Sequence, residues 1–289
     1  MELVRRGLVS SRDRAQAEIS AGRVLVRGLP ATKAARLVDD GDPVALQGPG
    51  PRFVSRGGEK LDAALDRFAV DVAGRHALDA GSSTGGFTDC LLQRGAAHVV
   101  AVDVGRGQLD SRLRADPRVT VRERTNVRNL TLADLHPNGD LRPNGDLRPT
   151  SRPTSRPTPE PFTVVVADLA FISLRTVADA LFGLAAPGAD MVLLVKPQFE
   201  AGKADADRER GVIRDTAVWA RALTGVLDAY AGRGAAIMGL MVSPLHGAEG
   251  NVEFLAHLVP GDTGPQVDVD VMVAGVVSEA TARDASAEG

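Results

Sequence analysis

The sequence predicts a small α+β domain followed by a Rossmann-like α/β domain with a mostly parallel, seven-stranded sheet. From residue 53 onward, apolar runs alternate with helical segments. Most of these runs are continuous, which is typical of parallel strands covered on both faces. The Gly- and Pro-rich stretch 47–51 cannot form a helix or a central strand. We therefore expect one domain over 1–47, a linker over 48–57 and a second domain over 58–289.

The first of these domains shows short elements only. Apolar residues over 3–19 follow an uneven helical period, and Ser10 and Ser11 can cap a second helix. Short strands are expected at 24–26 and 44–46. A chain of 289 residues with 44% hydrophobic content can bury one large core and one small one.

The strands of the second domain follow from its apolar runs. The candidates are 76–80, 99–104, 119–124, 163–169, 191–196, 235–242 and 252–259. The last run follows its predecessor too closely for a crossover helix, so we expect it to pair antiparallel at the sheet edge. Residues 136–161 repeat PNGDLR and then PTSR, which predicts a disordered insertion. Its arginines could touch RNA, but an expanded surface loop is the simpler interpretation.

Charge and cysteine content restrict the function classes. The net charge is −3, yet residues 1–60 hold eleven Lys and Arg against seven Asp and Glu, so the rest carries −7. A basic head on an acidic body favours a polyanionic partner over a randomly basic surface. The single cysteine, Cys90, excludes an internal disulfide and is expected to be a core thiol. Neither a membrane-spanning run nor a signal peptide is present, which predicts a cytoplasmic protein.

The most informative stretch, LDAGSSTGGFTDCLLQRGAAHVVAVDV, covers 78–104. It predicts a strand, a glycine turn, a helix and a second strand that ends near Asp103, where a ribose diol would lie. It lacks the dinucleotide fingerprint, because Ser82, Ser83 and Thr84 separate the glycines. This version suits a cofactor without a pyrophosphate, of which S-adenosylmethionine is the commonest. A nicotinamide or flavin site, or no ligand, remains open.

Four ionisable residues are candidates for catalysis. Asp168 and Lys196 end buried strands, Lys60 opens a helix before the glycine turn, and Glu253 begins the last strand. A lysine that ends a core strand needs partners, because burying an ammonium is costly. If the four converge, a lysine can take the proton of a ribose 2′-hydroxyl while the acids orient the lysines. The alternative is that each is a solitary surface charge.

These residues also carry a family resemblance. Lys60, Asp168, Lys196 and Glu253 resemble the K-D-K-E tetrad of FtsJ-type 2′-O-ribose methyltransferases. The segments VSRGGEKL, LDAGSSTGGFTD, VADLAFISL, LVKPQFEAGK and GNVEF resemble the TlyA family of ribosomal RNA methyltransferases. The head, LVRRGLVSSRDRAQAEISAGRVLVRG, resembles an S4 RNA-binding domain. The resemblance covers nearly the whole chain, apart from the repeat insertion and the last twenty residues.

The resemblance implies roles for individual residues. Lys196 would engage the hydroxyl most directly, Asp168 would lie between the cofactor and the lysines, and Lys60 and Glu253 would complete the set. The cofactor-binding residues would be Asp79, Gly81, Ser82, Thr84, Gly85, Gly86, Phe87, Asp103, Val104, Asn126 and Asp168. Among them, Asp103 would hold the ribose diol and Asn126 would lie near the adenine. No metal site is expected. Either Glu249 or Glu253 could be the glutamate of the tetrad. We prefer Glu253, because Glu253 follows Asn251 and Val252 directly.

The arginines of the head are the candidates for phosphate contacts, since their forks match phosphate geometry. The RNA-binding candidates are Arg5, Arg6, Arg12, Arg14, Arg23, Arg27, Arg52 and Arg56. By resemblance, the linker RFVSR could couple RNA docking to cofactor binding. We hypothesise an S-adenosylmethionine-dependent 2′-O-methyltransferase acting on ribosomal RNA or ribosomal subunits. The alternatives are a membrane-active hemolysin-like protein, a non-catalytic RNA-binding or assembly factor, and a dehydrogenase.

Overall fold

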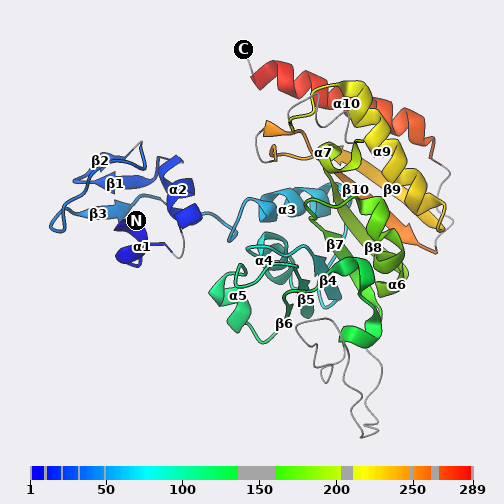
Figure 1. Ribbon diagram of the computed structural model, residues 1–289, viewed down its shortest axis with the longest axis horizontal. Helices are drawn as coiled ribbons and strands as arrows, with labels where there is room; N and C mark the ends of the chain where they lie inside the picture. Colours follow the sequence, from blue (N-terminus) through cyan, green and yellow to red (C-terminus); the bar gives the residue numbers. More distant parts are fainter. Residues whose placement is uncertain are drawn as a thin grey trace, which may run out of the picture. The chain divides into compact units, whose positions relative to one another are not determined.

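The computed structural model describes residues 2–9, 12–20, 22–31, 33–48, 50–135, 160–202, 211–247, 250–261 and 267–287. The chain divides into two compact units, Met1–Arg52 and Phe53–Gly289 (Figure 1). The repeat insertion predicted at 136–161 lies almost wholly outside the described residues, so its disorder stays a prediction. No helix in the described part of the chain is long and apolar enough to cross a membrane.

The first unit packs two short helices against a small antiparallel sheet of order β2-β1-β3. Its elements are α1 (Glu2–Arg5), α2 (Arg12–Ser20), β1 (Val24–Val26), β2 (Leu29–Pro30) and β3 (Val44–Leu46). The strands predicted at 24–26 and 44–46 are confirmed. The small core includes Leu3, Ala15, Val24, Val26 and Ala31.

The second unit is built on a seven-stranded sheet of order β6-β5-β4-β7-β8-β10-β9. Its strands are β4 (His76–Ala80), β5 (His98–Val102), β6 (Val119–Arg122), β7 (Phe162–Ala167), β8 (Ala185–Val195), β9 (Ala235–Val242) and β10 (Phe254–Pro260). The first five are parallel to one another, and β10 is antiparallel to both β8 and β9. The mostly parallel sheet with an antiparallel end is thus confirmed. One detail differs, because β9 lies outside β10 and forms the edge.

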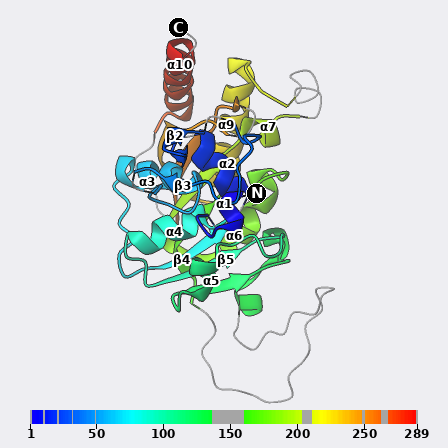
Figure 2. The same ribbon diagram turned by 90° about the vertical axis from the view of Figure 1, so that its left-hand side faces the viewer.

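Helices cover both faces of this sheet (Figure 1). One layer holds α3 (Gly57–Arg67), α4 (Gly86–Gln93) and α5 (Ser111–Ala115), and in Figure 2 this layer faces the reader. The other holds α6 (Ala178–Leu184), α9 (Thr216–Ala231) and α10 (Val269–Ala287). Within β7, Val164 and Val166 pack into the first layer, and Val165 and Ala167 pack into the second. Burial on both faces explains why the strands have continuous apolar sequences.

The carboxyl ends of three neighbouring strands lie side by side and position the candidate site. Ala80 of β4 pairs with Ala167 of β7, and Ala167 pairs with Leu193 of β8. Strands β7 and β8 end one or two residues earlier than predicted, so Asp168 and Lys196 lie just beyond them. At this edge of a parallel sheet, side chains from different strands can meet a ligand.

Candidate active site

The glycine turn after β4 has a backbone that other residues could not adopt without strain. Gly81 has φ +88°, and a Cβ there would overlap the carbonyl oxygen of Asp168. Gly85, the N-cap of α4, has φ +98°, and a Cβ there would overlap the side chain of Leu113. A Cβ at Gly86 would overlap the hydroxyl of Ser55. These glycines let three chain segments approach closely around the start of α4.

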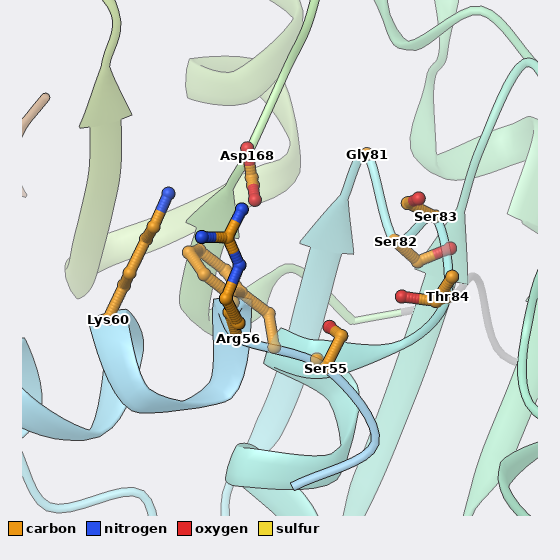
Figure 3. A pocket seen from close by; sticks show the side chains of 11 residues that line it. Ser55, Arg56, Lys60, Gly81, Ser82, Ser83, Thr84 and Asp168 are labelled. Atoms are coloured by element: carbon orange, nitrogen blue, oxygen red, sulfur yellow. The ribbon is translucent and has the colours of Figure 1, made fainter. Parts of the chain in front are cut away.

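A cavity of about 210 Å³ opens at this turn (Figure 3). It is lined by Ser55, Arg56, Gly57, Lys60, Gly81, Ser82, Ser83, Thr84, Gly86, Phe87 and Asp168. Six of the predicted cofactor-binding residues are therefore brought together: Gly81, Ser82, Thr84, Gly86, Phe87 and Asp168. The sequence reasoning missed Ser55, Gly57 and Ser83. The small residues just before α3 were the available signal for the first two.

The other predicted cofactor residues do not line the cavity. Gly85 and Asp103 shape the turn: Asp103 accepts hydrogen bonds from the backbone N–H of Ser83 at 2.8 Å and of Gly105 at 2.6 Å. Asn126 accepts from the N–H of Arg128 at 3.0 Å and caps a short 3₁₀ helix. Val104 is exposed. Any contact of these residues with a cofactor remains a prediction.

Asp79 lies beneath the turn and is fully buried. Its Oδ2 accepts a 2.6 Å hydrogen bond from the Thr88 hydroxyl, whereas its Oδ1 has no hydrogen-bond partner in the structure as described. Burial above all, with a smaller contribution from the charges of Asp168 and Asp103, raises the pKa of Asp79 to about 7 against the opposing effect of the hydrogen bonds from Thr88. Asp79 therefore titrates near neutral pH directly below the cavity.

The four candidate catalytic residues form two ion pairs at this edge of the sheet. Lys196 Nζ lies 2.5 Å from Asp168 Oδ1, and the Lys60 ammonium is bonded to the Glu253 carboxylate. Lys60 and Asp168 line the same cavity, with Arg56 between them in Figure 3. Phe254 of β10 pairs with Val195 of the antiparallel strand β8. Glu253 precedes the first residue of this pair and Lys196 follows the second, so both lie at the same end of the two strands. The structure thus brings all four together, and the alternative, Glu249, lies outside the described residues.

The loop before β10 encloses the carboxylate of Glu253, which is 3% exposed. A Cβ at Gly247 would overlap this carboxylate, and the Gly247 N–H donates to the carbonyl of Asn251 at 2.8 Å. The buried Asn251 side chain accepts from the N–H of Ile213 at 3.0 Å and donates to the carbonyl of Gly211 at 2.8 Å. These bonds fix Glu253 against Lys60.

Comparisons with known proteins agree with this geometry. Models of the S4 domain and of the FtsJ-like methyltransferase match residues 2–44 and 53–259. The chain is 48% identical over 258 residues to the 16S/23S rRNA (cytidine-2′-O)-methyltransferase TlyA of Mycobacterium tuberculosis, which covers 89% of this chain and 87% of that protein. The chain belongs to the TlyA family. The resemblance seen in the sequence is thereby confirmed.

Other members of the TlyA family carry a different name. Hemolysin A of Brachyspira hyodysenteriae is 35% identical over 88% of this chain and 95% of its own length. The solved structure of a candidate hemolysin from Streptococcus thermophilus superposes with a TM-score of 0.75 at 35% identity, covering 99% and 96% of the two chains.

An aromatic pair borders the ion pairs of this TlyA-family chain and was missed by the sequence reasoning. Phe171 is 92% exposed and adopts φ +63°, a conformation that is rare for a bulky residue. Its ring lies 5.2 Å from that of Phe199, which in turn lies 5.9 Å from Lys196 Nζ. Strain that persists at an exposed aromatic often marks a binding surface.

Four of the eight arginines predicted to bind RNA form ion pairs with acidic residues of the S4 unit. Arg27 pairs with Asp42 at 2.5 Å, and Arg23 pairs with Glu18 at 2.6 Å. Arg5 and Arg6 share Glu2. Arg12 and Arg52 are exposed, Arg56 lines the cavity of the methyltransferase unit, and the side chain of Arg14 is outside the described part. The basic surplus of the head is therefore partly neutralised at its surface.

Proposed function

We propose that this protein transfers a methyl group from S-adenosylmethionine to a ribose 2′-hydroxyl of ribosomal RNA. The observation that carries the proposal is the meeting of the Lys196–Asp168 and Lys60–Glu253 pairs beside a glycine-turn cavity. A hydroxyl needs a proton acceptor to become a nucleophile, and this arrangement supplies an amine held by a carboxylate.

The cavity suits the proposed cofactor. The glycine turn allows backbone to approach a ligand closely, and the charges of Asp103 and Asp168 make the surroundings acidic. Carboxylates are appropriate neighbours for S-adenosylmethionine, which supplies a methyl group activated by a positively charged sulfonium. Gly81, Ser82, Thr84, Gly86 and Phe87 would hold it.

The lysines of this chain would handle the proton and the developing charge. The proton that Lys196 holds in its ion pair with Asp168 must leave to solvent before the reaction. The neutral Lys196 Nζ would then accept the proton of the ribose 2′-hydroxyl as that oxygen bonds to the methyl carbon. S-adenosylmethionine would supply the methyl group, and its sulfur would keep the electron pair of the carbon–sulfur bond. Asp168 then stabilises the ammonium that has formed on Lys196. Lys60, held by Glu253, adds a fixed positive charge near the developing oxyanion. General-base assistance of this kind contributes about 10²–10⁴ in rate.

RNA docking is assigned to the S4 unit and to the rim of the cavity. The eight arginines predicted from the sequence are proposed to contact phosphates: Arg5, Arg6, Arg12, Arg14, Arg23, Arg27, Arg52 and Arg56. Arg5, Arg6, Arg23 and Arg27 have acidic partners that phosphates would have to displace. The Phe171–Phe199 pair offers a stacking surface for a base next to the target ribose.

The test is to incubate the protein with methyl-labelled S-adenosylmethionine and purified ribosomal subunits, and to map ribose methylation. Label on a ribose supports the proposal; label on a base, or on no ribosomal RNA, overturns it. The Lys196→Ala variant should leave the ribose unlabelled.

The membrane-active alternative rests on the hemolysin name of relatives such as the Brachyspira protein. A liposome-leakage assay separates the two functions, and we expect no leakage.

A further inference from the structure

A buried carboxylate outside the cavity and the tetrad links the two loops that carry Asp168 and Lys196. Glu200 ends the short helix α7 (Pro197–Glu200), four residues after Lys196, and is 4% exposed. Its carboxylate accepts hydrogen bonds from the Ser173 hydroxyl at 2.5 Å and from the Leu174 N–H at 2.6 Å. Both donors belong to the loop that follows Asp168.

The same two loops touch at three places. At the cavity, Lys196 pairs with Asp168 at 2.5 Å. In the middle, the rings of Phe199 and Phe171 lie 5.2 Å apart. At the far end, Glu200 binds its two donors, and a third approaches from Arg175 Nε at 3.4 Å. The two loops are therefore in contact from the Lys196–Asp168 pair at one end to the hydrogen bonds of Glu200 at the other.

The far end of this contact is anchored in the rigid part of the unit. Arg175 Nη2 donates to the backbone carbonyl of Glu200 at 2.8 Å, and Arg175 also packs beside Gly225 of α9. The hydroxyl of Tyr230, fully buried on α9, donates to the carbonyl of Leu174 at 3.2 Å. A displacement at Glu200 would thus let the Asp168 loop move away from the Lys196 turn.

A buried carboxylate is a costly way to join two loops. Burial raises the pKa of Glu200, and the bonds from Ser173 and Leu174 only partly oppose it. Apolar residues of similar volume would often hold two segments at no cost in stability. What a carboxylate adds is direction, because it fixes its donors to within a few tenths of an ångström.

We propose that Glu200 is a positioning residue for methyl transfer: it fixes the 168–175 loop against the Lys196 turn, so that Asp168 holds the Lys196 ammonium in place. This inference rests on the proposed function. Catalytic groups displaced by about 1 Å lose roughly 10²-fold in rate, whereas binding made elsewhere is unaffected.

The test compares Glu200→Gln with Asp190→Asn in the full-length protein. The Gln variant keeps the shape but replaces one of the two accepting oxygens by an N–H₂ group, so only one of the bonds from Ser173 and Leu174 can be kept as it is. Asp190 is the matched control, since it accepts from Arg75 at 2.5 Å and from His257 at 2.7 Å in the middle of β8, away from the Lys196 turn. For each variant, Tm, calorimetric S-adenosylmethionine affinity and kcat for ribose methylation are measured at a temperature where it is fully folded.

We expect Glu200→Gln to lower kcat about 10- to 100-fold with cofactor affinity changed less than about twofold. Asp190→Asn should lower Tm yet leave kcat within about twofold. An unchanged kcat in folded Glu200→Gln, or an equal kcat loss in Asp190→Asn, overturns the inference. A wild-type protein that methylates no ribose overturns the proposed function itself, and the inference with it.

Ser173→Ala is a milder variant that removes one donor, in case Glu200→Gln does not fold. It should lower kcat in the same direction by a smaller factor. Combined with Glu200→Gln it should add little, because both changes break one contact. Fully additive losses in the double variant would show that Glu200 acts by another route and would refute the proposal.

Discussion

Lys196 and Asp168 form a 2.5 Å ion pair, although they are 28 positions apart and follow two different strands, β8 and β7. Their strands are parallel neighbours, and both end at the edge where the glycine turn follows β4. The Lys196 side chain is 13% exposed and that of Asp168 is 26% exposed, so solvent screens this pair incompletely. The pair therefore combines a fixed geometry with access to a ligand.

Replacing Lys196 by alanine removes the proposed proton acceptor and leaves every residue that lines the cavity in place. We expect kcat for ribose methylation to fall by about 10²–10⁴, the usual contribution of general-base catalysis. Calorimetry should show S-adenosylmethionine affinity within about threefold of the wild type. A variant that retains more than a tenth of the activity would exclude Lys196 as the base.

Variants of the Lys60–Glu253 pair can separate its contribution to stability from its contribution to activity. Glu253→Gln leaves a buried ammonium without its counter-charge, which typically costs about 3–5 kcal/mol. Replacing both residues by methionine removes the two charges together, so urea unfolding should show a stability near that of the wild type. Methyl transfer should nevertheless be lost in the double variant. Recovery of activity along with stability would show that this pair is only structural.

Asp79 predicts a specific pH dependence of stability. Its pKa is about 7 in the folded protein against 3.8 as the ordinary value, so the folded state keeps a proton that the unfolded state releases. The free energy of unfolding therefore falls as pH rises from about 4 to about 7, by at most ~4 kcal/mol from this group. Asp79→Asn is always neutral and can still accept from Thr88.

Urea unfolding at pH 5 and pH 8 checks this expectation. The stability of Asp79→Asn relative to the wild type should increase between the two pH values. A difference that stays constant with pH would mean that Asp79 is ionised throughout this range.

Gly81 tests whether the turn itself forms the cofactor site. Gly81→Ala adds a Cβ that overlaps the carbonyl of Asp168, on a backbone with φ +88°. Gly74 is the matched control, because it has φ +70° but open space where an added Cβ would lie. Both variants should lose about 1 kcal/mol from backbone strain. Only Gly81→Ala should lose S-adenosylmethionine binding in calorimetry, and equal affinities in the two variants would contradict the assignment.

Local sequence patterns carried most of the fold. The segments predicted at 76–80 and 235–242 match strands β4 and β9 residue for residue, although β4 contains Asp79 and β9 is only partly buried. In β7, which is buried on both faces, the apolar run 164–167 lies wholly within the strand. The insertion of β10 between β8 and β9 was not predictable in this way. Strand order depends on which edge the returning chain can reach, and no single run encodes that.

The site was predictable where chemistry is local and not where it depends on tertiary contacts. The glycines at 81, 85 and 86 lie close together in the sequence, which indicates a turn where a ligand or another chain segment comes close to the backbone. The lining by Ser55, by contrast, depends on how the segment before α3 docks: the Val54 N–H donates to Asp89 of α4 at 2.8 Å. The acidic partners of Arg23 and Arg27 likewise come from folding of the S4 unit.

Phe171 should contribute to RNA binding and not to folding. Its ring is 92% exposed on a left-handed backbone with a strain of about 1–3 kcal/mol, which exceeds the roughly 0.5–1.5 kcal/mol that its contact with the Phe199 ring contributes. Phe171→Gly should therefore raise Tm slightly. A stacked base is typically worth about 1–3 kcal/mol, so KM for ribosomal RNA should increase roughly 5- to 150-fold in the same variant.

Val271→Ala is the control for this change. Alanine is used because Val271 lies within helix α10, where glycine would itself be destabilising. That side chain is also exposed, at 68%, and lies away from the cavity lining. Its removal should leave KM for RNA unchanged. If Phe171→Gly lowers Tm and leaves KM at the wild-type value, the ring supports the loop and does not meet a base, because strain relief and lost stacking predict the opposite pair of results.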